Sequence, residues 1–384
     1  MAAIGAKLVF IGTGAPLKGV YAYNFDTAQW EWLYETGLTV FDAATACWDG
    51  AYHIWFQING DYHYRLNMID YTISAFLADE PDTSYRRFYT HDYDGLLYAS
   101  GNGNIFRSFD HGVGDWADDP NPGVSGVSIV VPPSAVEQPG MLFHATTLSQ
   151  AFKMYNPATG VWANKLNAPG NMERGDIVWA NEFVFTNQGG GKDFYKYNVN
   201  ANTWATVAAR SVNAHPEGQH LTWDYDDNGY IYWFEPTGSI YRYDIGGDSW
   251  SGFATVPGTI YAHGSLVYVP RIRYLFLNSS GEIVANPMNL GAEFSGETGS
   301  GVLYYVKALE TVGATTLAIE ADARTDADDL LDIAADNNGV PGAWGNSVAL
   351  GAMAENGTVP FWIRVDASGA PTTQPRCARL KLTT

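Results

Sequence analysis

The sequence predicts an all-β protein whose first 294 residues form a β-propeller. Aromatic residues make up 14% of the chain and glycines number 41, a mixture that favours strands joined by tight turns. One motif recurs at intervals of 40 to 46 residues, the length of a unit of four short strands. Hydrophobic residues reach 46% and charged residues only 16%, so the chain can bury a sizeable core.

The motif is an aromatic residue, then Asn or Asp, with Trp seven residues after the first position. Its best copies pair Tyr23 with Trp30, Phe109 with Trp116, Tyr155 with Trp162, Tyr197 with Trp204, and Tyr243 with Trp250. A weaker copy pairs Ile69 with Phe76, and a degenerate one begins at Ala285. We expect the Asn or Asp to cap a turn by accepting bonds from backbone amides downstream. We expect the Trp to pack between neighbouring blades.

Residues 220–253 illustrate one complete unit. Strand sequences at 220–225, 230–234 and 239–243 and a fourth from Trp250 are separated by turns rich in Asp, Gly and Pro. Four such strands form a blade, and blades stacked in a ring bury both faces of each sheet. Seven blades with incomplete first and last units are favoured. Six blades, with C-terminal strands completing the first, are the alternative.

These copies resemble the kelch repeat, which carries the same Tyr-Asn/Asp and Trp pattern after a strand pair. Residues 189–191, three glycines, match the glycine pair that ends the second strand of kelch units. Residues 99–101 and 234–236 depart from that pattern. The resemblance implies a kelch-like propeller as architecture. It does not assign a function, because such propellers include enzymes, adaptors and adhesins.

A second domain is predicted at residues 302–384, after a linker at 295–301. Short strand patterns there suggest an immunoglobulin-like β-sandwich without its cysteine pair. Residues 346–365 resemble a small sandwich module of bacteriophage and prophage virion proteins. The resemblance rests on a Leu-Gly turn, a Gly-containing loop, the strand Pro-Phe-Trp-Ile-Arg and a last strand with Arg at 376–382. It implies an architectural role without catalytic residues.

The strand that contains Trp362 and Arg364 supplies the candidate interface residues. Alternate residues point to opposite faces of a sheet, so Phe361 and Ile363 share one face and Trp362 and Arg364 the other. If the first pair fills the sandwich core, Trp362 and Arg364 can contact a partner. The alternative is that Trp362 packs against its own propeller or into the sandwich.

The net charge of −20 disfavours nucleic acid and anionic membrane surfaces as partners. No apolar run reaches the roughly 18 residues of a membrane span. The N-terminus lacks the pattern of a secretory signal, so we expect synthesis in the host cytoplasm. Two cysteines far apart, Cys47 and Cys377, give neither a disulfide framework nor a metal motif.

No catalytic or cofactor motif is expected. The acidic stretch 320–336 reads as a solvated face, with structural Ca²⁺ as the alternative. The histidines, His144 among them, show no metal-binding spacing. Trp residues outside the motif are expected mostly in the core, with one or two at blade mouths able to stack on sugars. These residues are Trp32, Trp48, Trp55, Trp179, Trp223 and Trp233.

The resulting hypothesis is a non-enzymatic structural protein of a bacteriophage-like virion, as a tail, fibre or capsid-decoration component. Its partners would be other virion proteins and copies of itself, and the propeller would be displayed for binding protein or a host-surface glycan. The alternative is a carbohydrate-binding host-attachment lectin, followed by a propeller glycosidase.

Overall fold

The computed structural model describes most of the chain as short antiparallel strands, and no helix occurs in the part that it describes. The start of the degenerate motif copy at Ala285 lies outside this part. The described residues are 4–12, 19–35, 45–50, 52–58, 62–76, 87–91, 96–101, 106–110, 115–124, 126–132, 138, 140–146, 149–188, 191–210, 221–224, 229–235, 238–257, 264–284, 288–289, 301–320, 331–365 and 377–383.

The first four-stranded sheet joins the two ends of the N-terminal region. We call each such sheet of this region a blade. Blade 1 has the order β24–β1–β2–β3, with β24 (Gly264–Val269), β1 (Lys7–Gly12), β2 (Gly19–Asn24) and β3 (Gln29–Glu35). β24 pairs antiparallel with the whole of β1. A strand from the end of the region therefore completes the sheet begun at its start, and so covers an edge of that sheet.

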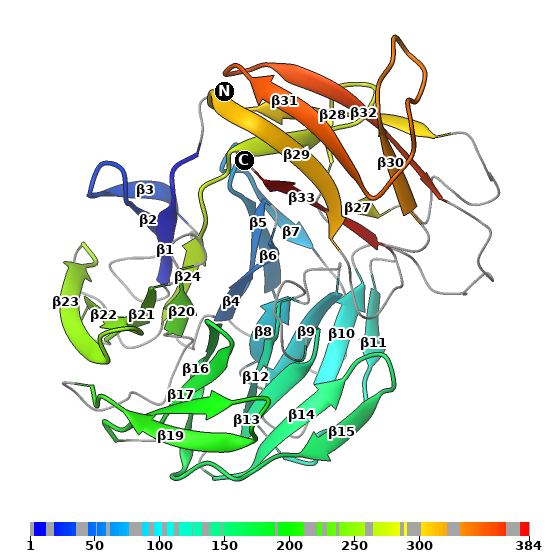
Figure 1. Ribbon diagram of the computed structural model, residues 1–384. Coiled ribbons are helices and arrows are strands. Elements are labelled where there is room, and N and C mark those ends of the chain that lie inside the picture. The colour runs from blue at the N-terminus through cyan, green and yellow to red at the C-terminus, as the bar shows by residue number, and fades with distance from the viewer. Residues whose placement is uncertain are drawn as a thin grey trace.

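Five more blades follow in chain order, each an antiparallel meander. Blade 2 comprises β4 (Thr45–Trp48), β5 (His53–Ile58), β6 (Tyr62–Asn67) and β7 (Ile73–Phe76); blade 3, β8 (Arg87–His91), β9 (Leu96–Gly101), β10 (Phe106–Asp110) and β11 (Asp115–Asp118); blade 4, β12 (Gly126–Val130), β13 (Leu142–Thr146), β14 (Phe152–Asn156) and β15 (Val161–Asn164); blade 5, β16 (Met172–Ala180), β17 (Phe183–Gln188), β18 (Phe194–Asn198) and β19 (Thr203–Val207); blade 6, β20 (Leu221–Trp223), β21 (Tyr230–Phe234), β22 (Ser239–Asp244) and β23 (Ser249–Thr255). First strands of adjacent blades contact one another around a closed circuit, from β24 through β4, β8, β12, β16 and β20 back to β24 (Figure 1).

The strand pairing corrects the preference for seven blades. The strands expected to form a last unit, β25 (Tyr274–Leu277) and β26 (Ile283–Val284), belong to a different sheet together with C-terminal strands. β24 is instead the inner strand of blade 1, the arrangement of the six-blade alternative. The described strands therefore leave no sheet for a seventh position in the circuit.

The repeated motif occupies the turn between the third and fourth strands of a blade. Its two outer residues are direct cross-strand partners: Tyr23 with Trp30, Phe109 with Trp116, Tyr155 with Trp162, Tyr197 with Trp204, and Tyr243 with Trp250. The spacing of seven follows from this pairing, because the second and seventh motif positions also pair and four turn residues lie between them. The Asn or Asp caps the turn as expected. Asp26 N bonds Asn24 Oδ1, Ala158 N bonds Asn156 Oδ1, Asn200 N bonds Asn198 Oδ1, and Gly247 N bonds Asp244 Oδ1, at 2.8–3.1 Å.

The weaker motif copy is out of register by three residues. In blade 2 the cross-strand partners at the motif position are Leu66 and Ile73, and not Ile69 and Phe76. Asn67 accepts a hydrogen bond from Ile69 N at 2.8 Å, as the capping residue does in other blades. The corrected copy begins midway between Tyr23 and Phe109, so the repeat is more regular in the structure than in the sequence pattern. The misplacement arose because blade 2 has aliphatic residues where the other blades have aromatic ones.

Each motif Trp of blades 4 to 6 is tied to the preceding blade. Trp204 Nε1 donates to Leu166 O at 2.8 Å, while Leu166 N donates to Asn202 Oδ1 at 3.0 Å. Blade 6 repeats this arrangement on Ala208, whose carbonyl accepts from Trp250 and whose amide donates to Asp248. In blades 5 and 6, the Trp of the fourth strand therefore bonds the backbone carbonyl of one residue of the preceding blade. The Asn or Asp of the turn that leads into that strand bonds the backbone amide of the same residue.

The corresponding hydrogen bond in blade 4 accounts for the glycine at position 160. In blade 4, Trp162 Nε1 donates to Pro120 O at 2.5 Å. Proline has no amide hydrogen, so no acceptor is needed at position 160, which is glycine. In the four of these turns that the structure describes, the residue two before the Trp is left-handed, with φ from 45° to 67°, which favours Gly, Asn and Asp. These residues are Ala28, Gly160, Asn202 and Asp248.

The C-terminal residues form two sheets over one hydrophobic core, which we call the C-terminal sandwich. One sheet has the order β26–β25–β28–β32–β30, with β28 (Val302–Ala308), β32 (Thr358–Val365) and β30 (Leu331–Ala335). The other has the order β27–β33–β29–β31, with β27 (Met288–Asn289), β33 (Cys377–Thr383), β29 (Val312–Glu320) and β31 (Ser347–Met353). Both sheets contribute to the core, which contains Val306, Leu317, Ile333, Phe361 and Ile363. The sandwich lies in the upper part of Figure 1.

The change from blades to sandwich falls earlier than the boundary predicted at residue 294. β24 ends at Val269 in blade 1, and β25 begins at Tyr274 in the sandwich. Ile272, between them, lies in one buried cluster with Leu275, Leu309 and residues of blade 2 such as Ile54. One core therefore continues from the propeller region into the sandwich.

We expect residues 1–270 to fold without the sandwich, because β24 completes blade 1 before that point. The fragment should show a β-type circular dichroism spectrum and one cooperative thermal transition. Its melting temperature should be lower than that of the full chain, because removing Ile272, Leu275 and Leu309 exposes apolar surface of blade 2. An unfolded 1–270 fragment beside a folded full chain would show that the propeller depends on the sandwich.

Candidate functional site

The predicted contact residues Trp362 and Arg364 lie on the outer face of the five-stranded sheet. Phe361 and Ile363, which alternate with them along β32, are 0% exposed in the sandwich core. Trp362 and Arg364 are half-buried. The alternation follows the strand period of two. It leaves an indole and a guanidinium on the surface side of a well-packed strand.

Neighbouring side chains hold both residues in place. Arg364 Nε and Nη2 donate to Asp332 Oδ2 at 2.9 and 2.6 Å, and the guanidinium lies 4.5 Å from the centre of the Trp344 ring. Trp362 Nε1 donates to Asp336 Oδ1 at 2.8 Å. We call these five residues the sandwich contact face. The indole N–H of Trp362 and two guanidinium nitrogens of Arg364 are already hydrogen-bonded within the face, so a partner that covers these side chains does not leave those groups without a partner.

The contact face lies away from the joint with the propeller. Leu275 of β25 lies in the joint, whereas β32 and β30, which hold three of the five residues of the contact face, are the second and third strands away from β25 in the same sheet. The described neighbours of Trp362 belong to the sandwich, with Leu303 and Ala334 as cross-strand partners.

Sequence reasoning missed Trp344, Asp332 and Asp336 as members of this face. The two aspartates were assigned to a solvated acidic stretch, but they pair with Arg364 and Trp362. The alternation of β30, with Asp332 opposite Arg364 and Ala334 opposite Trp362, could have indicated the ion pair. Trp344 gave no periodic signal because it lies in a loop.

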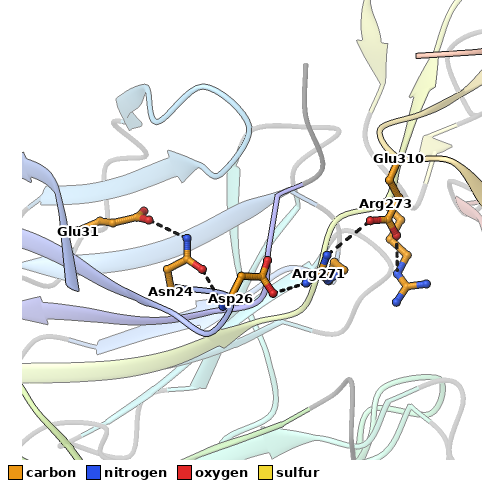
Figure 2. A network of polar contacts seen from close by, with 6 residues as sticks. All are labelled: Asn24, Asp26, Glu31, Arg271, Arg273 and Glu310. Atoms are coloured by element: carbon orange, nitrogen blue, oxygen red, sulfur yellow. Dashed lines mark hydrogen bonds and ion pairs between the residues drawn. The ribbon is translucent and has the colours of Figure 1, made fainter. Parts of the chain in front are cut away.

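A polar network strengthens the joint between blade 1 and the sandwich (Figure 2). Arg271 bonds Asp26 of the β2–β3 turn and lies 3.5 Å from Glu310 of the sandwich, and Arg273 lies 3.3 Å from the same Glu310. The network extends through Asn24, whose Oδ1 accepts from Asp26 N and whose Nδ2 donates to Glu31 at 2.7 Å. Burial alone would raise the pKa of Glu31, but hydrogen bonds from Lys7 and Asn24 lower it. The ion pairs thus link a blade turn to the sandwich.

A cavity of about 190 Å³ opens at the same joint. Its lining includes Trp48 and Tyr52 of blade 2, the connecting residues Arg271 and Arg273, and Leu380 of β33. Burial raises the pKa of the Tyr52 phenol well above its ordinary value, and Tyr52 Oη accepts a bond from Phe276 N at 3.2 Å. The cavity is small, and its two arginines are already paired with carboxylates, so it gives no defined ligand chemistry.

Among the described residues, no three His, Cys, Asp or Glu side chains gather as a metal centre would require, and residues 321–330 of the acidic stretch lie outside this part of the chain. His144 lies inside blade 4 and not at a blade mouth. Its ring contacts Ser128 Oγ through Nδ1 at 2.9 Å and Val124 O through Nε2 at 3.2 Å. Because a carbonyl only accepts, Nε2 carries the hydrogen and Nδ1 accepts from Ser128. Other histidines of interest, His215, His220 and His263, lie outside the described residues.

Comparisons with known proteins support the fold class. No protein-family model and no curated protein matches the sequence. In structure, the chain is similar to a β-propeller in the crystal structure of a nidogen/laminin complex, with a TM-score of 0.53 and 8% identity. The match covers 68% of this chain and 98% of that one. The N-terminal region is therefore a β-propeller, and at this identity the likeness concerns the fold alone. In the described residues, no helix is long and apolar enough to cross a membrane.

Proposed function

We propose that the chain is a non-enzymatic structural protein of a bacteriophage-like virion, built from a six-bladed kelch-like propeller and an immunoglobulin-like sandwich. The sandwich attaches to other particle proteins or to a second copy, and the propeller is displayed. The resemblance of residues 346–365 to virion sandwich modules supports the particle. The closed circuit of six inner strands supports the blade number.

The observation that carries the attachment role is the sandwich contact face. Trp and Arg are the residue types most enriched where truncation costs binding energy. Here Arg364 is fixed between Asp332 and Trp344, and Trp362 is fixed by Asp336. Side chains already held in one conformation lose little entropy when a partner covers them.

The joint supports a display role for the propeller. A continuous buried cluster and the Arg271 network connect the two units. A joint of this kind fixes the orientation of the propeller relative to whatever the sandwich contacts.

The test is Trp362→Ala in the full chain, with incorporation into purified particles measured by immunoblot. We expect incorporation to fall at least about tenfold, as loss of a central aromatic contact costs more than about 1.4 kcal/mol. Val340→Ala is the matched control, because Val340 is an exposed apolar residue in the loop that follows Asp336. Thermal melting verifies that both variants fold. Normal incorporation of a folded Trp362→Ala protein would contradict the attachment role. Light scattering of the free protein measures whether the sandwich binds a second copy of the chain.

A carbohydrate-binding host-attachment protein is the second candidate. One observation favours it: two large aromatic side chains of blade 1, Trp32 and Tyr34, are exposed on the propeller. This function is compatible with the first if the displayed propeller is the part that contacts a host.

A further inference from the structure

The outermost strand of blade 1, β3, carries two tryptophans on one face. Trp30 pairs with Tyr23 and Trp32 pairs with Tyr21, so the two residues occupy alternate positions of a regular ladder and point to the same side. That side faces blade 6, because Tyr21 lies in one buried cluster with Tyr232 of that blade, and Trp30 packs against the same cluster. Trp32 is 51% exposed, so the expectation of a core position does not hold for it.

The other exposed aromatic residue of this strand lies on the opposite face. A register shift follows Trp32, and Tyr34 pairs with Val20, which lies in the buried cluster shared with blade 2. Tyr34 is 42% exposed, but its side chain is on the blade 2 side of the sheet. The surface that faces blade 6 is therefore formed by Trp30 and Trp32 alone, and we call these two side chains the indole pair.

Trp30 lacks the contacts that fix the motif Trp in blades 4 to 6. There, each indole N–H donates to a backbone carbonyl of the preceding blade. Each of those indoles also lies 4.9–5.2 Å from a Phe ring of that blade, between ring centres. Blade 6 has Ile240 where those Phe residues stand, three positions before the motif aromatic. Among the described residues, neither Trp30 Nε1 nor Trp32 Nε1 has an acceptor.

The two indoles are oriented alike on the tyrosines beneath them. The ring planes of Trp32 and Tyr21 meet at 86°, and those of Trp30 and Tyr23 at 69°. In blades 3 to 6 the corresponding angle is 35–51°. A Cβ built on Gly19 would lie 2.9 Å from Trp32 Cη2, so the glycine leaves room for this orientation. A ring that is supported on one side loses little entropy when a ligand covers the other.

Blades 5 and 6 show that the fold does not require Trp at position 32. At the same place in the ladder, two residues before the motif aromatic, Tyr195 pairs with Thr206 and Tyr241 pairs with Gly252. Both blades thus keep the tyrosine and have a small residue opposite it. A large exposed aromatic side chain that the fold does not need calls for another explanation.

From this geometry we infer that the indole pair binds a neutral carbohydrate. Each indole offers a flat apolar face that matches the C–H face of a sugar ring, and an N–H that can donate to a sugar hydroxyl. Alternate positions of a strand lie roughly 7 Å apart, so both indoles can contact one oligosaccharide. The inference rests on the carbohydrate-binding candidate function and names its site.

Charge and size select this class of ligand. The Arg242 guanidinium lies 5.8 Å from the ring centre of Phe253, which packs 5.1 Å from Tyr23 beneath Trp30. This positive charge disfavours the cationic ligands that indole faces can otherwise bind. The net charge of −20 repels sialylated and uronic-acid glycans. Two side chains also offer far less area than the roughly 800 Å² per partner of a specific protein interface.

The experiment is a glycan array probed with the full chain, followed by calorimetric titration of the best neutral oligosaccharide. Trp32→Thr, which gives blade 1 the residue of blade 5, should bind at least about tenfold more weakly. Trp30→Phe keeps a ring but removes the N–H, and should bind about two- to tenfold more weakly. Tyr34→Ala is the matched control, because it removes an exposed ring of the same strand from the opposite face, and it should bind as the wild type does.

Thermal melting of each variant shows whether it folds, and Trp30→Phe tests the inference if Trp32→Thr does not. Three results would overturn it: equal affinity in a folded Trp32→Thr variant, an equal loss in Tyr34→Ala, or binding of charged glycans only. These results leave carbohydrate binding in place at another site. Binding of no glycan at millimolar concentration would overturn both the inference and the carbohydrate-binding function. Particle incorporation, measured through Trp362, is independent of all four.

Discussion

Replacing Phe194 with alanine is expected to lower the free energy of unfolding by about 3–5 kcal/mol, as other large core truncations do. Phe194 is 0% exposed. Its ring centre lies 5.3 Å from that of Tyr243 and 5.2 Å from that of Trp250, both in the next blade. The substitution leaves a cavity between two blades whose strands cannot close on it without breaking their own pairing. Denaturant titration followed by fluorescence measures the change.

Two comparisons make this prediction specific. Trp250→Ala removes the other side of the same contact but should cost less, about 1–3 kcal/mol, because Trp250 is half-buried and loses one hydrogen bond to Ala208 O. Val161→Ala, on an exposed outer strand, should change stability by less than about 0.5 kcal/mol. If Phe194→Ala costs no more than Val161→Ala, aromatic packing between blades 5 and 6 does not stabilise the ring.

Acidification is expected to destabilise the protein by roughly 3 kcal/mol through His144 alone. His144 is 1% exposed, and burial lowers its pKa from 6.5 to about 4. Above about pH 6.5 the imidazole is neutral in both states and contributes no pH dependence. Between pH 6.5 and 4 the unfolded chain binds a proton that the folded chain does not, so stability falls as pH falls. Below pH 4 both states are protonated and the loss is complete.

The measurement is the free energy of unfolding as a function of pH, in the wild type and in His144→Gln. The variant should be less stable at pH 7, because the Ser128 and Val124 contacts change, but its stability should vary less between pH 6.5 and 4.5. That window excludes carboxylates such as Asp248, whose pKa is lowered by bonds from Ala208 N and Tyr243 and whose contribution is lost only at lower pH. Equal pH slopes in both proteins would exclude His144 as the cause.

The propeller could be predicted because its signal is repeated and local. The capping of a four-residue turn by Asn or Asp is fixed by chemistry within the turn, and five aromatic–Trp pairs, each seven residues apart, reproduce it. In blade 2 the sequence pattern gives the wrong register for the motif, because Leu66 and Ile73 replace the aromatic pair. Aliphatic residues are common in every strand and so do not mark one position. The hydrogen bonds between blades could not be predicted because they join distant residues, such as Leu166 with Asn202 and Trp162 with Pro120.

The domain boundary and the blade number depend on which strands pair across large distances in the sequence, and no local sequence pattern indicates those pairings. β25 has the composition of a blade strand, and only its pairing with β28 shows that it belongs to the sandwich. At the candidate site, strand alternation was enough to divide Phe361 and Ile363 from Trp362 and Arg364. Trp344 and the two aspartates required the loop conformation, which depends on tertiary contacts.

The pairing of β24 with β1 has a consequence for synthesis on the ribosome. β1 leaves the exit tunnel before its partner β24, which follows on the order of 250 residues later and, at 5–20 residues per second, after a wait of about 10–50 s. During that time the nascent chain exposes an edge whose residues Leu8, Val9, Phe10 and Ile11 are all fully buried in the finished protein. A segment of this kind can pair with the same segment of a neighbouring nascent chain. The rate of translation and the chaperones that bind emerging chains therefore influence the yield of this protein.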